Sequence, residues 1–316
     1  MNHPILCIGE LLIDFFSIDR KASLLDSDTF TKRAGGAPAN VCAAIAKLGG
    51  EAHFCGKVGN DAFGDFLQNT LEQLNVHTTL LLKDNSHPTT LAFVSLQEDG
   101  QRDFIFNRGA DANLSVEDVP LHIFNTVKLV HFGSATALLP GPLQQTYRTL
   151  LDAAKDNQCY ISFDPNFRSD LWKGHEAEFV KLARDLIAKC DFLKVSDEEL
   201  FLLTNEKDIP KAVTELHNLG AKCIAITLGK DGTYLSCKGA ATIIPSIPIQ
   251  AVDTTGAGDA FVGATLYQLG KLDSPESLSY QDWQDIVQFS NKAAAKVCEK
   301  VGAIEALPTL GEIQSI

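Results

Sequence analysis

A Gly-rich stretch that ends in an acid, Asp253 to Asp259 (DTTGAGD), is the part of this sequence best suited to chemistry. Apolar residues at helical spacing follow it, so we expect a turn that opens a helix. Unpaired amide N–H groups and the helix dipole make the turn Gly256-Ala257-Gly258 a site for an anion such as phosphate. Asp259 can then take a proton from a hydroxyl that attacks the phosphate. The alternative is a tight turn whose acid only complements the helix dipole, and the combination of strand, glycines, acid and helix argues against it.

Three residues near the N-terminus are suited to holding a polyol. Gly35 and Gly36 precede an Ala-rich segment that we expect to be helical, and glycines there let a ligand approach the backbone closely. Asn40, in the first turns of that helix, offers both a donor and an acceptor. A plain Gly-Gly turn is the alternative.

Asp14 is a fourth polar candidate in this region. It lies beyond the apolar segment Ile5 to Gly9, which has the pattern of a buried strand. Ligands of open α/β sheets collect beyond the carboxyl ends of the strands, so Asp14 is a candidate binding residue. From the sequence alone, a solvated loop acid is an equally good interpretation.

The motif Asp164-Pro165-Asn166-Phe167-Arg168 follows another expected strand. Asn166 can hydrogen-bond the hydroxyls of a polyol, and the guanidinium of Arg168 can hold a phosphate through its fork of donors. A salt bridge to a neighbouring carboxylate is the structural alternative for Arg168. Arg108, which follows a strand rich in aromatic residues, can reach into the same ligand site or remain a solvated residue.

Lys194 and Glu199 flank the start of a further expected helix. Ser196 is a natural N-cap, and Glu199 has the spacing of its partner in a capping box. Such a box by itself explains the presence of Ser196 and Glu199. Lys194, at the end of the preceding strand, can offset the charge of a phosphate.

The elements that must position these residues alternate between strands and helices. Apolar runs predict strands at 5–9, 51–58, 76–82, 129–132, 159–164, 192–195 and 223–228, and a hairpin at 233–244. Helical periodicity predicts helices at 41–48, 61–74, 142–155, 176–188, 198–204, 211–219, 260–269 and 283–300. The alternation is typical of a parallel, helix-covered sheet in an α/β protein, which we expect to be one domain over residues 1–316.

Two β-rich runs, 89–97 and 102–107, interrupt that alternation. Residues 98–101 between them (EDGQ) predict a hairpin turn. We expect the hairpin to leave the main sheet and to join residues 11–16 in a small separate sheet, a lid formed by about 11–33 and 88–108. Such a lid keeps water out of a cleft during a transfer reaction.

Composition restricts the class of protein. With 316 residues, 45% of them hydrophobic, the chain can bury a large core. The formal net charge of −13 argues against a nucleic acid or an anionic membrane as partner. The eight cysteines stand singly in apolar runs, and neither a signal peptide nor a run of about 20 apolar residues occurs, so we expect a cytoplasmic protein with reduced thiols.

Taken together and in order, the motifs resemble those of the PfkB carbohydrate kinases, also called the ribokinase family. DTTGAGD resembles the C-terminal signature of that family, and Ala34 to Asn40 (AGGAPAN) resembles its N-terminal signature. The resemblance covers nearly the whole chain. It implies a ribokinase-like three-layer sandwich with a mostly parallel central sheet and a small β-sheet lid. Lids pair in many members of the family, so a homodimer is expected.

The resemblance also implies roles for the candidate residues. Asp259 would be the catalytic base, and Gly256, Ala257 and Gly258 would be the anion hole. The sugar-binding residues would be Asp14, Gly35, Gly36, Asn40, Arg108 and Asn166. The ATP-binding residues would be Arg168, Lys194, Thr227, Gly229, Gly232 and Asn291.

Two kinds of metal ion are implied as well. Glu199 would organise the water shell of the Mg²⁺ that accompanies ATP, and Ser196 stands where the family has Asn. Asp253 and Thr255, together with the loop Val301 to Ile304, would form a K⁺ site.

The implied activity is ATP-dependent phosphorylation of a sugar. The Gly-Ala-Asp at 109–111 resembles that of fructokinases, which phosphorylate D-fructose at its 6-hydroxyl, and the motif 164–168 resembles those of both fructokinases and 2-keto-3-deoxygluconate kinases. A fructokinase is the leading interpretation. A 2-keto-3-deoxygluconate kinase, whose acid substrate Arg108 could bind, is the nearest alternative. Ribose or aminoimidazole riboside is a more distant substrate.

Proteins of other classes fit the sequence less well. A dinucleotide oxidoreductase needs G-x-G-x-x-G, but Phe261 takes the place of the third glycine. The G-x-x-x-x-G-K-[ST] motif of P-loop kinases does not occur in the sequence. A non-catalytic sugar-binding relative would normally have lost the base, whereas Asp259 is present.

Overall fold

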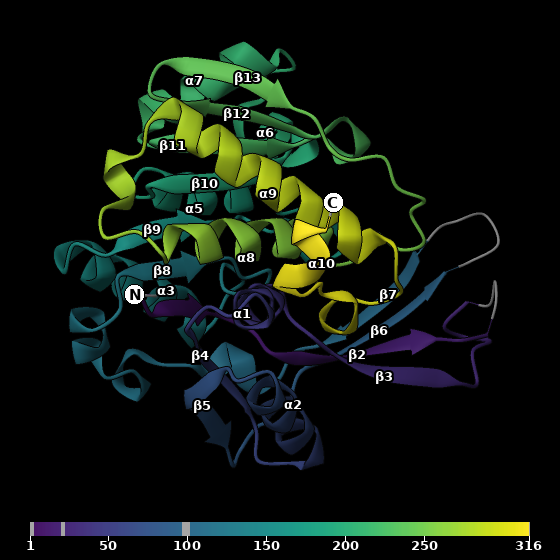
Figure 1. The fold of residues 1–316 in the computed structure, drawn as a ribbon. Helices are drawn as coiled ribbons and strands as arrows, with labels where there is room; N and C mark the ends of the chain where they lie inside the picture. The colour runs from purple at the N-terminus through teal and green to yellow at the C-terminus, as the bar shows by residue number, and fades with distance from the viewer. Residues whose placement is uncertain (1–2, 20–22, 97–101, 316) are drawn as a thin grey trace.

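The computed structural model describes residues 3–19, 23–96 and 102–315, which form two sheets and their covering helices (Figure 1). The larger sheet has nine strands in the order β13-β12-β11-β10-β9-β8-β1-β4-β5. In chain order these are β1 (Ile5–Ile8), β4 (Ala52–Gly59), β5 (His77–Asp84), β8 (Leu129–Phe132), β9 (Tyr160–Phe163), β10 (Phe192–Ser196), β11 (Cys223–Thr227), β12 (Thr233–Cys237) and β13 (Ala240–Ile244). Neighbouring strands from β5 to β11 pair in parallel, and the hairpin β12–β13 extends the sheet antiparallel. The predicted α/β class and mostly parallel sheet are confirmed.

Helices cover both faces of this sheet, which gives three layers (Figure 1). Side chains of β1 alternate between two separate cores, because Ile5 and Cys7 join one cluster while Leu6 and Ile8 join the other. The first core is shared with α1 (Ala37–Lys47), α2 (Ala62–Gln73), α8 (Ala257–Leu269) and α9 (Tyr280–Cys298). The second is shared with α3 (Pro142–Asp156), α5 (Glu176–Ile187), α6 (Asp197–Thr204) and α7 (Ile209–Leu219). Two short α-helices, α4 (Ser169–Trp172) and α10 (Leu310–Gln314), complete the α-helices of the described residues.

The smaller sheet has four strands in the order β3-β2-β6-β7 and extends away from the main body (Figure 1). It contains β2 (Leu12–Ser17), β3 (Phe30–Gly35), β6 (Leu91–Leu96) and β7 (Arg102–Asn107). β2 pairs in parallel with β6, as expected if residues 11–16 and the hairpin leave the main sheet together. The predicted turn at 98–101 lies outside the described residues.

Strand β3 was not predicted, because its sequence, FTKRAG, is polar. Two of its charged side chains lie against aromatic rings. Lys32 Nζ is 3.7 Å from the ring centroid of Phe66, and the guanidinium carbon of Arg33 is 5.9 Å from that of Phe16. These cation–π contacts let charged residues occupy a strand that carries few apolar side chains.

Helix ends follow local capping. α1 begins at Ala37, because Gly36 is its N-cap with φ 110° and Pro38 occupies its first turn, so Asn40 lies in the first turns of the helix as expected. α8 begins at Ala257 because Gly256 adopts the left-handed conformation, with φ 77°. The side chain of Asp61 accepts hydrogen bonds from two amides of α2, as its predicted N-cap role requires.

The eight cysteines are free and buried, in agreement with the prediction from their positions in apolar runs. Within the part of the chain that the structure describes, no helix has the length and apolar character to cross a membrane.

Candidate functional site

The first turns of α1 and α8 lie beside each other in the centre of the molecule (Figure 1). The helices approach closely because Gly263 faces Ala44. A Cβ placed on Gly263 would lie 2.5 Å from the Cβ of Ala44, which is too close for any side chain. Small residues at this crossing therefore bring two distant segments of the chain, the predicted anion turn and the predicted polyol site, to one place.

Asp259 and Asn40 join these two helix starts directly. Asn40 Nδ2 donates a hydrogen bond to Asp259 Oδ2 at 2.8 Å, and both side chains are buried. The other polar atom of the amide, Asn40 Oδ1, is buried without a hydrogen-bond partner among the described residues. A buried acceptor without a partner is costly, so this oxygen is suited to receive a hydroxyl of a ligand.

The environment of Asp259 suits proton transfer near neutral pH. Burial raises the pKa of Asp259 to about 6, although the hydrogen bond from Asn40 and the charge of Arg168 lower it. A carboxylate with a pKa in this range is ionised at neutral pH and is still basic enough to accept a proton from an attacking hydroxyl.

A cavity of about 510 Å³ opens beside Asp259 and Asn40. The main body contributes Glu10, Gly36, Asn40, Arg168 and Asp259 to its lining. The smaller sheet contributes Leu12, Asp14, Phe16, Ala92, Val94, Phe104 and Phe106. The cavity is thus enclosed between polar groups of the main body and a largely apolar face of the smaller sheet, as in many sites for small polar molecules.

Asp14 enters this cavity from β2, and Gly35 makes its position possible. Gly35 lies on β3 opposite Leu12, two residues before Asp14, and a Cβ on Gly35 would be 1.9 Å from Asp14 Oδ2. Gly36 is similarly constrained, since a Cβ there would lie 2.4 Å from the carbonyl oxygen of Glu10. Burial raises the pKa of Asp14 to about 7, with Arg168 lowering it and Glu10 raising it.

Glu10 lines the same cavity and was not predicted as a site residue. Its carboxylate accepts hydrogen bonds from the amides of Ala37 at 3.0 Å and Ala135 at 3.2 Å, and from the hydroxyl of Ser134. Burial raises the pKa of Glu10. Its place directly after β1, the signal that singled out Asp14, could have identified it. The carboxylate fixes the start of α1, which carries Asn40.

A second cavity, of about 360 Å³, lies on the other side of Asp259. Lys194, Ser196, Glu199, Asn166 and Gly258 are among its lining residues. Three residues, Gly256, Arg168 and Asp259, line both cavities. The two spaces therefore meet at the Gly-rich turn and its acid, with one chamber on each side.

Lys194 is a buried cation beside the Gly-rich turn. Its Nζ forms an ion pair with Asp164 at 2.9 Å, and a Cβ on Gly258 would lie 3.0 Å from it. Burial lowers the pKa of Lys194, but the charges of Asp164 and Glu199 outweigh burial and leave that pKa raised. Lys194 therefore stays protonated where a phosphate would meet the turn.

Glu199 has the capping-box role that the sequence suggests and a further contact. Its Oε2 accepts from the amide of Ser196 at 2.7 Å, and its Oε1 accepts from the amide of Phe167 at 2.8 Å. The capping box fixes Glu199 at the start of α6, and the hydrogen bond from Phe167 links it to the motif after β9. Glu199 therefore faces the second cavity from a fixed position.

Arg168 lies between the two cavities and is held there by Asn166. Arg168 donates to Asn166 Oδ1 at 3.1 Å and to the carbonyl of Phe167 at 3.0 Å, and it makes no ion pair with a carboxylate in the described part of the chain. The salt-bridge alternative for Arg168 is thus not observed. Asn166 lines the second cavity rather than the first, and its Nδ2 donates to the carbonyl of Gly133 at 2.8 Å.

Comparison with known proteins decides the family. The model described as "pfkB family carbohydrate kinase" matches residues 2–310. The chain belongs to this family. It is an ATP-dependent carbohydrate kinase, as the resemblance of its motifs implied.

Individual pfkB relatives cover the whole chain. Fructokinase-2 of Zea mays is 38% identical over 322 residues, which span 100% of this chain and 94% of the relative. A crystal structure of fructokinase with bound ATP from Xylella fastidiosa has a TM-score of 0.88 at 29% identity and covers 100% of this chain and 98% of that one. A fructokinase double mutant from Vibrio cholerae O395, in a form with bound fructose, ADP and potassium ion, has a TM-score of 0.88 at 28% identity and covers 100% of this chain and 99% of that one.

Arg108, predicted as a sugar ligand of this pfkB kinase, does not reach the cavity. Its guanidinium donates to the carbonyl oxygens of Thr136 at 2.9 Å and Pro140 at 2.8 Å, and it pairs with the buried Asp111 at 3.3 Å. These contacts fix the loop 134–140 beside the cavity, so the structure gives Arg108 a supporting role instead.

Of the six residues predicted to bind ATP, Arg168 and Lys194 line the second cavity, whereas Thr227, Gly229, Gly232 and Asn291 line neither cavity. Asn291 accepts from Thr233 Oγ1 at 2.6 Å and donates to the carbonyl of Ile244 at 3.0 Å, which fastens α9 to the hairpin β12–β13. Thr227 ends β11, and Gly229 and Gly232 form the turn after it with φ of 57° and 100°.

Asp253 and Thr255 form a compact cluster at the start of the Gly-rich turn. Asp253 Oδ1 accepts from the amide and hydroxyl of Thr255 at 3.0 and 2.7 Å, and its Oδ2 accepts from the amide of Gly302 at 2.9 Å. Asp253 thereby ties the turn to the loop 301–304, the two segments predicted to share an ion.

Proposed function

We propose that this pfkB kinase is a fructokinase that converts D-fructose and ATP into D-fructose 6-phosphate and ADP. One observation carries the proposal: a cavity sized for a small polar molecule and a cavity lined by Lys194 and the Gly-rich turn meet at Asp259. This arrangement places a base between an alcohol acceptor and a phosphoryl donor, as direct transfer requires.

The reaction follows from these positions. Asp259 accepts the proton of the 6-hydroxyl as that oxygen bonds to the γ-phosphorus, and the bond from that phosphorus to the bridging oxygen of ADP breaks. The amides of Gly256, Ala257 and Gly258 hold the charge on the transferred phosphoryl group. Lys194 and Arg168 add positive charge on the donor side.

The sugar would lie in the first cavity. We assign its hydroxyls to Asp14 and to the unpaired Oδ1 of Asn40, with Gly35 and Gly36 leaving room for the acid and the ligand. Asn166, which faces the second chamber, would act by holding Arg168 rather than by binding the sugar. The adenosine would extend toward the turn of Gly229 and Gly232 beside Thr227 and Asn291.

The second cavity fits the Mg²⁺ that kinases of this type use. Three carboxylates, Asp164, Glu199 and Asp259, act on the buried cation Lys194. Even with the guanidinium of Arg168 counted, these carboxylates outnumber the two cations, so negative charge is in excess there. We propose that Glu199 holds Mg²⁺ through water, because Mg²⁺ keeps much of its water shell in proteins. The ion would supply neutralisation of the charge on the ATP phosphates.

A K⁺ ion is proposed at Asp253 and Thr255. The relative from Vibrio cholerae was solved with fructose, ADP and potassium ion. In this chain the carboxylate and hydroxyl oxygens of Asp253 and Thr255 are the candidate ligands, beside the loop 301–304. An ion there would rigidify the turn that leads into the anion hole.

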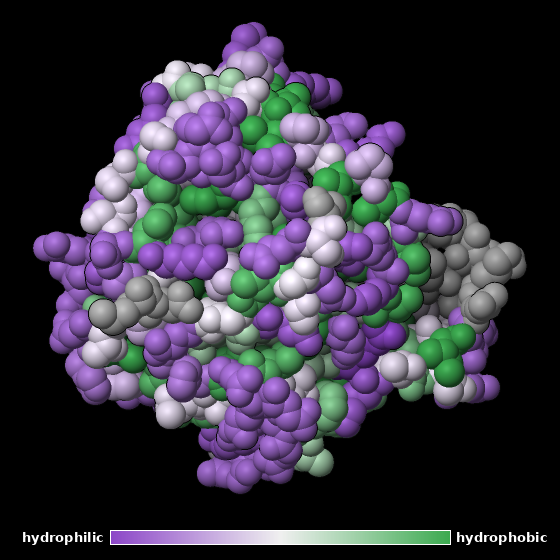
Figure 2. Space-filling model, viewed as in Figure 1, coloured by the Kyte–Doolittle hydropathy of each residue, from purple (hydrophilic) through white to green (hydrophobic). Residues whose placement is uncertain are grey.

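We propose that the smaller sheet is a lid, formed by about 11–33 and 88–108, and that it also pairs two copies of the chain. Its aromatic face lines the sugar cavity, so closing it would exclude water. Large apolar side chains that remain exposed include Ile18, Leu25 and Ile105 in these segments. Figure 2 shows hydrophobic surface near this sheet, as well as on other parts of the same face, and exposed apolar surface of this kind is typical of an interface. The eight buried thiols fit a reducing compartment, so the cytoplasm is the proposed location.

Fructose is preferred over 2-keto-3-deoxygluconate for two reasons. The curated relatives, which include Fructokinase-2 of Zea mays and Probable fructokinase-4 of Arabidopsis thaliana, carry the fructokinase name. Arg108, the cation expected to bind the carboxylate of 2-keto-3-deoxygluconate, instead contacts Asp111 and two backbone carbonyl groups.

Release of ADP with each of four sugars tests the proposal. Fructose, 2-keto-3-deoxygluconate, ribose and glucose would be compared at equal concentration with Mg²⁺ and ATP. We expect the highest kcat/KM with fructose. A higher kcat/KM with another sugar would overturn the assignment of fructose but not of the kinase family.

A further inference from the structure

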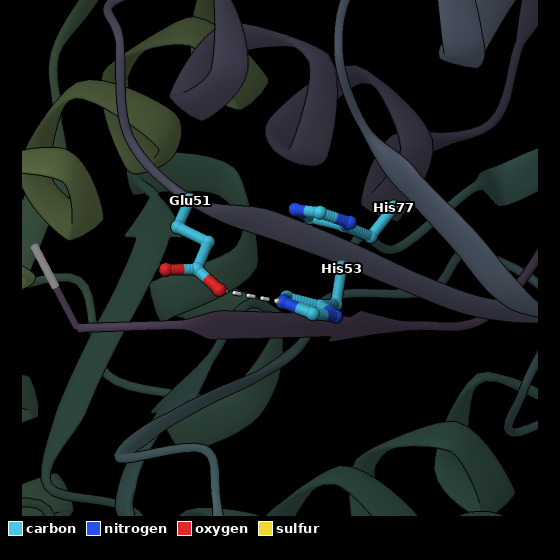
Figure 3. A group of neighbouring side chains, drawn as sticks. All are labelled: Glu51, His53 and His77. Atoms are coloured by element: carbon cyan, nitrogen blue, oxygen red, sulfur yellow. Dashed lines mark hydrogen bonds and ion pairs between the residues drawn. The ribbon is translucent and has the colours of Figure 1, made fainter.

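Glu51, His53 and His77 form a cluster on the main sheet (Figure 3), and none of the three lines either of the two cavities. They lie where β4 and β5 begin, whereas the site residues follow the ends of the parallel strands β1, β9 and β10. The cluster therefore lies at the amino ends of the parallel strands, whereas Asp259 lies near their carboxyl ends.

The sheet geometry brings the three side chains to one face. Ala52, between Glu51 and His53, is fully buried, so these two alternate residues lie together on the other side of the strand. His77, on the edge strand β5, is the register partner of His53. The register shifts immediately afterwards, between His53 and Cys55, and irregularities of this kind re-aim side chains.

The side chains already contact one another. His53 Nε2 lies 3.2 Å from Glu51 Oε1, and the rings of His53 and His77 stack with centroids 4.4 Å apart at 18°. Figure 3 shows the carboxylate directed at the His53 ring with the His77 ring beside it. Glu51 is 42% exposed, and His77 is also exposed, so both have solvent on one side into which they can adjust.

We propose that Glu51, His53 and His77 bind a divalent transition-metal ion, for which Zn²⁺ is the best fit. One ligand atom from each residue lies within 4.8 Å of the others. Around a tetrahedral Zn²⁺, with bonds of about 2.0–2.2 Å, ligand atoms are about 3.3 Å apart, so the three atoms must close by no more than about 1.5 Å. Two imidazoles and a carboxylate suit Zn²⁺, whereas Mg²⁺ prefers oxygen ligands alone.

The site leaves a fourth position for water, because the cluster opens to solvent. Binding joins the start of β4 to the edge strand β5, which has β4 as its neighbour in the sheet. An ion that binds the folded protein through both strands stabilises it by mass action. Protons compete for the imidazole nitrogens, so binding weakens at acid pH.

Zinc titration of the metal-free, full-length protein tests the proposal. We expect one Zn²⁺ per chain by calorimetry in the absence of ATP and Mg²⁺, with a Zn²⁺-dependent rise in Tm. Loss of an outer-shell partner alone costs about 10–100-fold in metal affinity. His77→Ala, which removes an exposed ligand, should therefore weaken binding at least about tenfold and abolish the rise in Tm.

His122→Ala is the matched control, because His122 is exposed on the 3-10 segment Leu121–Asn125, outside the cluster. It should bind Zn²⁺ as the unmodified chain does. All variants keep the eight cysteines, so zinc held by thiols would persist in His77→Ala. Equal affinity in His77→Ala and the unmodified chain, or no saturable binding at all, would overturn the proposal. Kinase turnover is expected to be unchanged in both variants.

Discussion

Asn40 Nδ2 and Asp259 Oδ2 are 2.8 Å apart although 219 residues separate them in the sequence. This hydrogen bond joins the starts of two helices, one from each signature of the family. It orients the carboxylate and leaves Asn40 Oδ1 for a ligand. The proposed sugar-binding amide of Asn40 and the proposed base Asp259 are thus positioned as one unit. The following predictions test that unit.

The acid limb of the pH profile should reflect Asp259. Its pKa is about 6, so the ionised base is lost as the pH falls through 6. We expect kcat at saturating fructose and ATP to fall about tenfold for each pH unit below that value. Initial rates of ADP release on both sides of pH 6 measure this. A rate that is constant through pH 6 would contradict the assignment of the base.

Asn40→Ala should move that limb to higher pH. The hydrogen bond from Asn40 lowers the pKa of Asp259, so its loss lets burial raise the pKa further. A hydrogen bond to a charged group contributes roughly 1.5–3 kcal/mol, so kcat/KM for fructose should fall about tenfold or more. The matched control is Asn218→Ala, at an exposed position on α7, which should leave the profile in place. A change in KM for ATP alone would argue against the proposed role of Asn40.

Gly35→Ala should impair sugar binding selectively. The new Cβ would lie 1.9 Å from Asp14 Oδ2, so the acid or the strand must move. We expect KM for fructose to rise about tenfold or more, the cost of one displaced hydrogen bond to a charged group, with little change in KM for ATP. Gly311→Ala, where the Cβ would meet nothing within 4 Å, provides the control. Unchanged fructose kinetics in Gly35→Ala would remove Asp14 from the sugar site.

Ionisation of the buried carboxyl of Asp259 should lower the free energy of unfolding at pH values above its pKa. Its pKa rises from 3.8 to about 6 on folding, so in this window the native protein holds more protons than the unfolded chain. Stability from this group is therefore lost as the pH rises from 3.8 through 6. Asp259→Asn should raise the free energy of unfolding by about 1–3 kcal/mol above pH 6, with a smaller gain near pH 4. Urea unfolding at both pH values would show it, and a variant less stable than the unmodified chain above pH 6 would contradict it.

The local parts of the fold and site could be predicted from the sequence. The Gly-rich turn, the N-cap at Asp61 and the hairpin that leaves the main sheet depend on neighbouring residues, whose pattern carries the information. Strand β3 was missed because its Lys32 and Arg33 lie against aromatic rings of other elements, Phe66 and Phe16. No periodicity in FTKRAG reports such contacts.

Long-range contacts decided the remaining differences. Arg108 has the charge of a ligand residue, but carbonyl groups 28 and 32 residues away engage it. The side-chain amide of Asn291 is similarly hydrogen-bonded to Ile244 and Thr233, which are 47 and 58 residues away. Glu10 becomes part of the site because Ser134 and Ala135 approach it in the fold. These partners could not be identified from spacing along the chain.

Phosphoryl transfer by Asp259→Asn tests the central claim most directly. The variant keeps the size of the side chain and can still accept the hydrogen bond from Asn40, so binding of fructose and ATP should persist in calorimetry. Its kcat should be at least about 10²-fold lower, the usual scale for loss of a positioned general base. Turnover equal to that of the unmodified chain would contradict the account, because the acid between the two cavities would then have no part in the reaction.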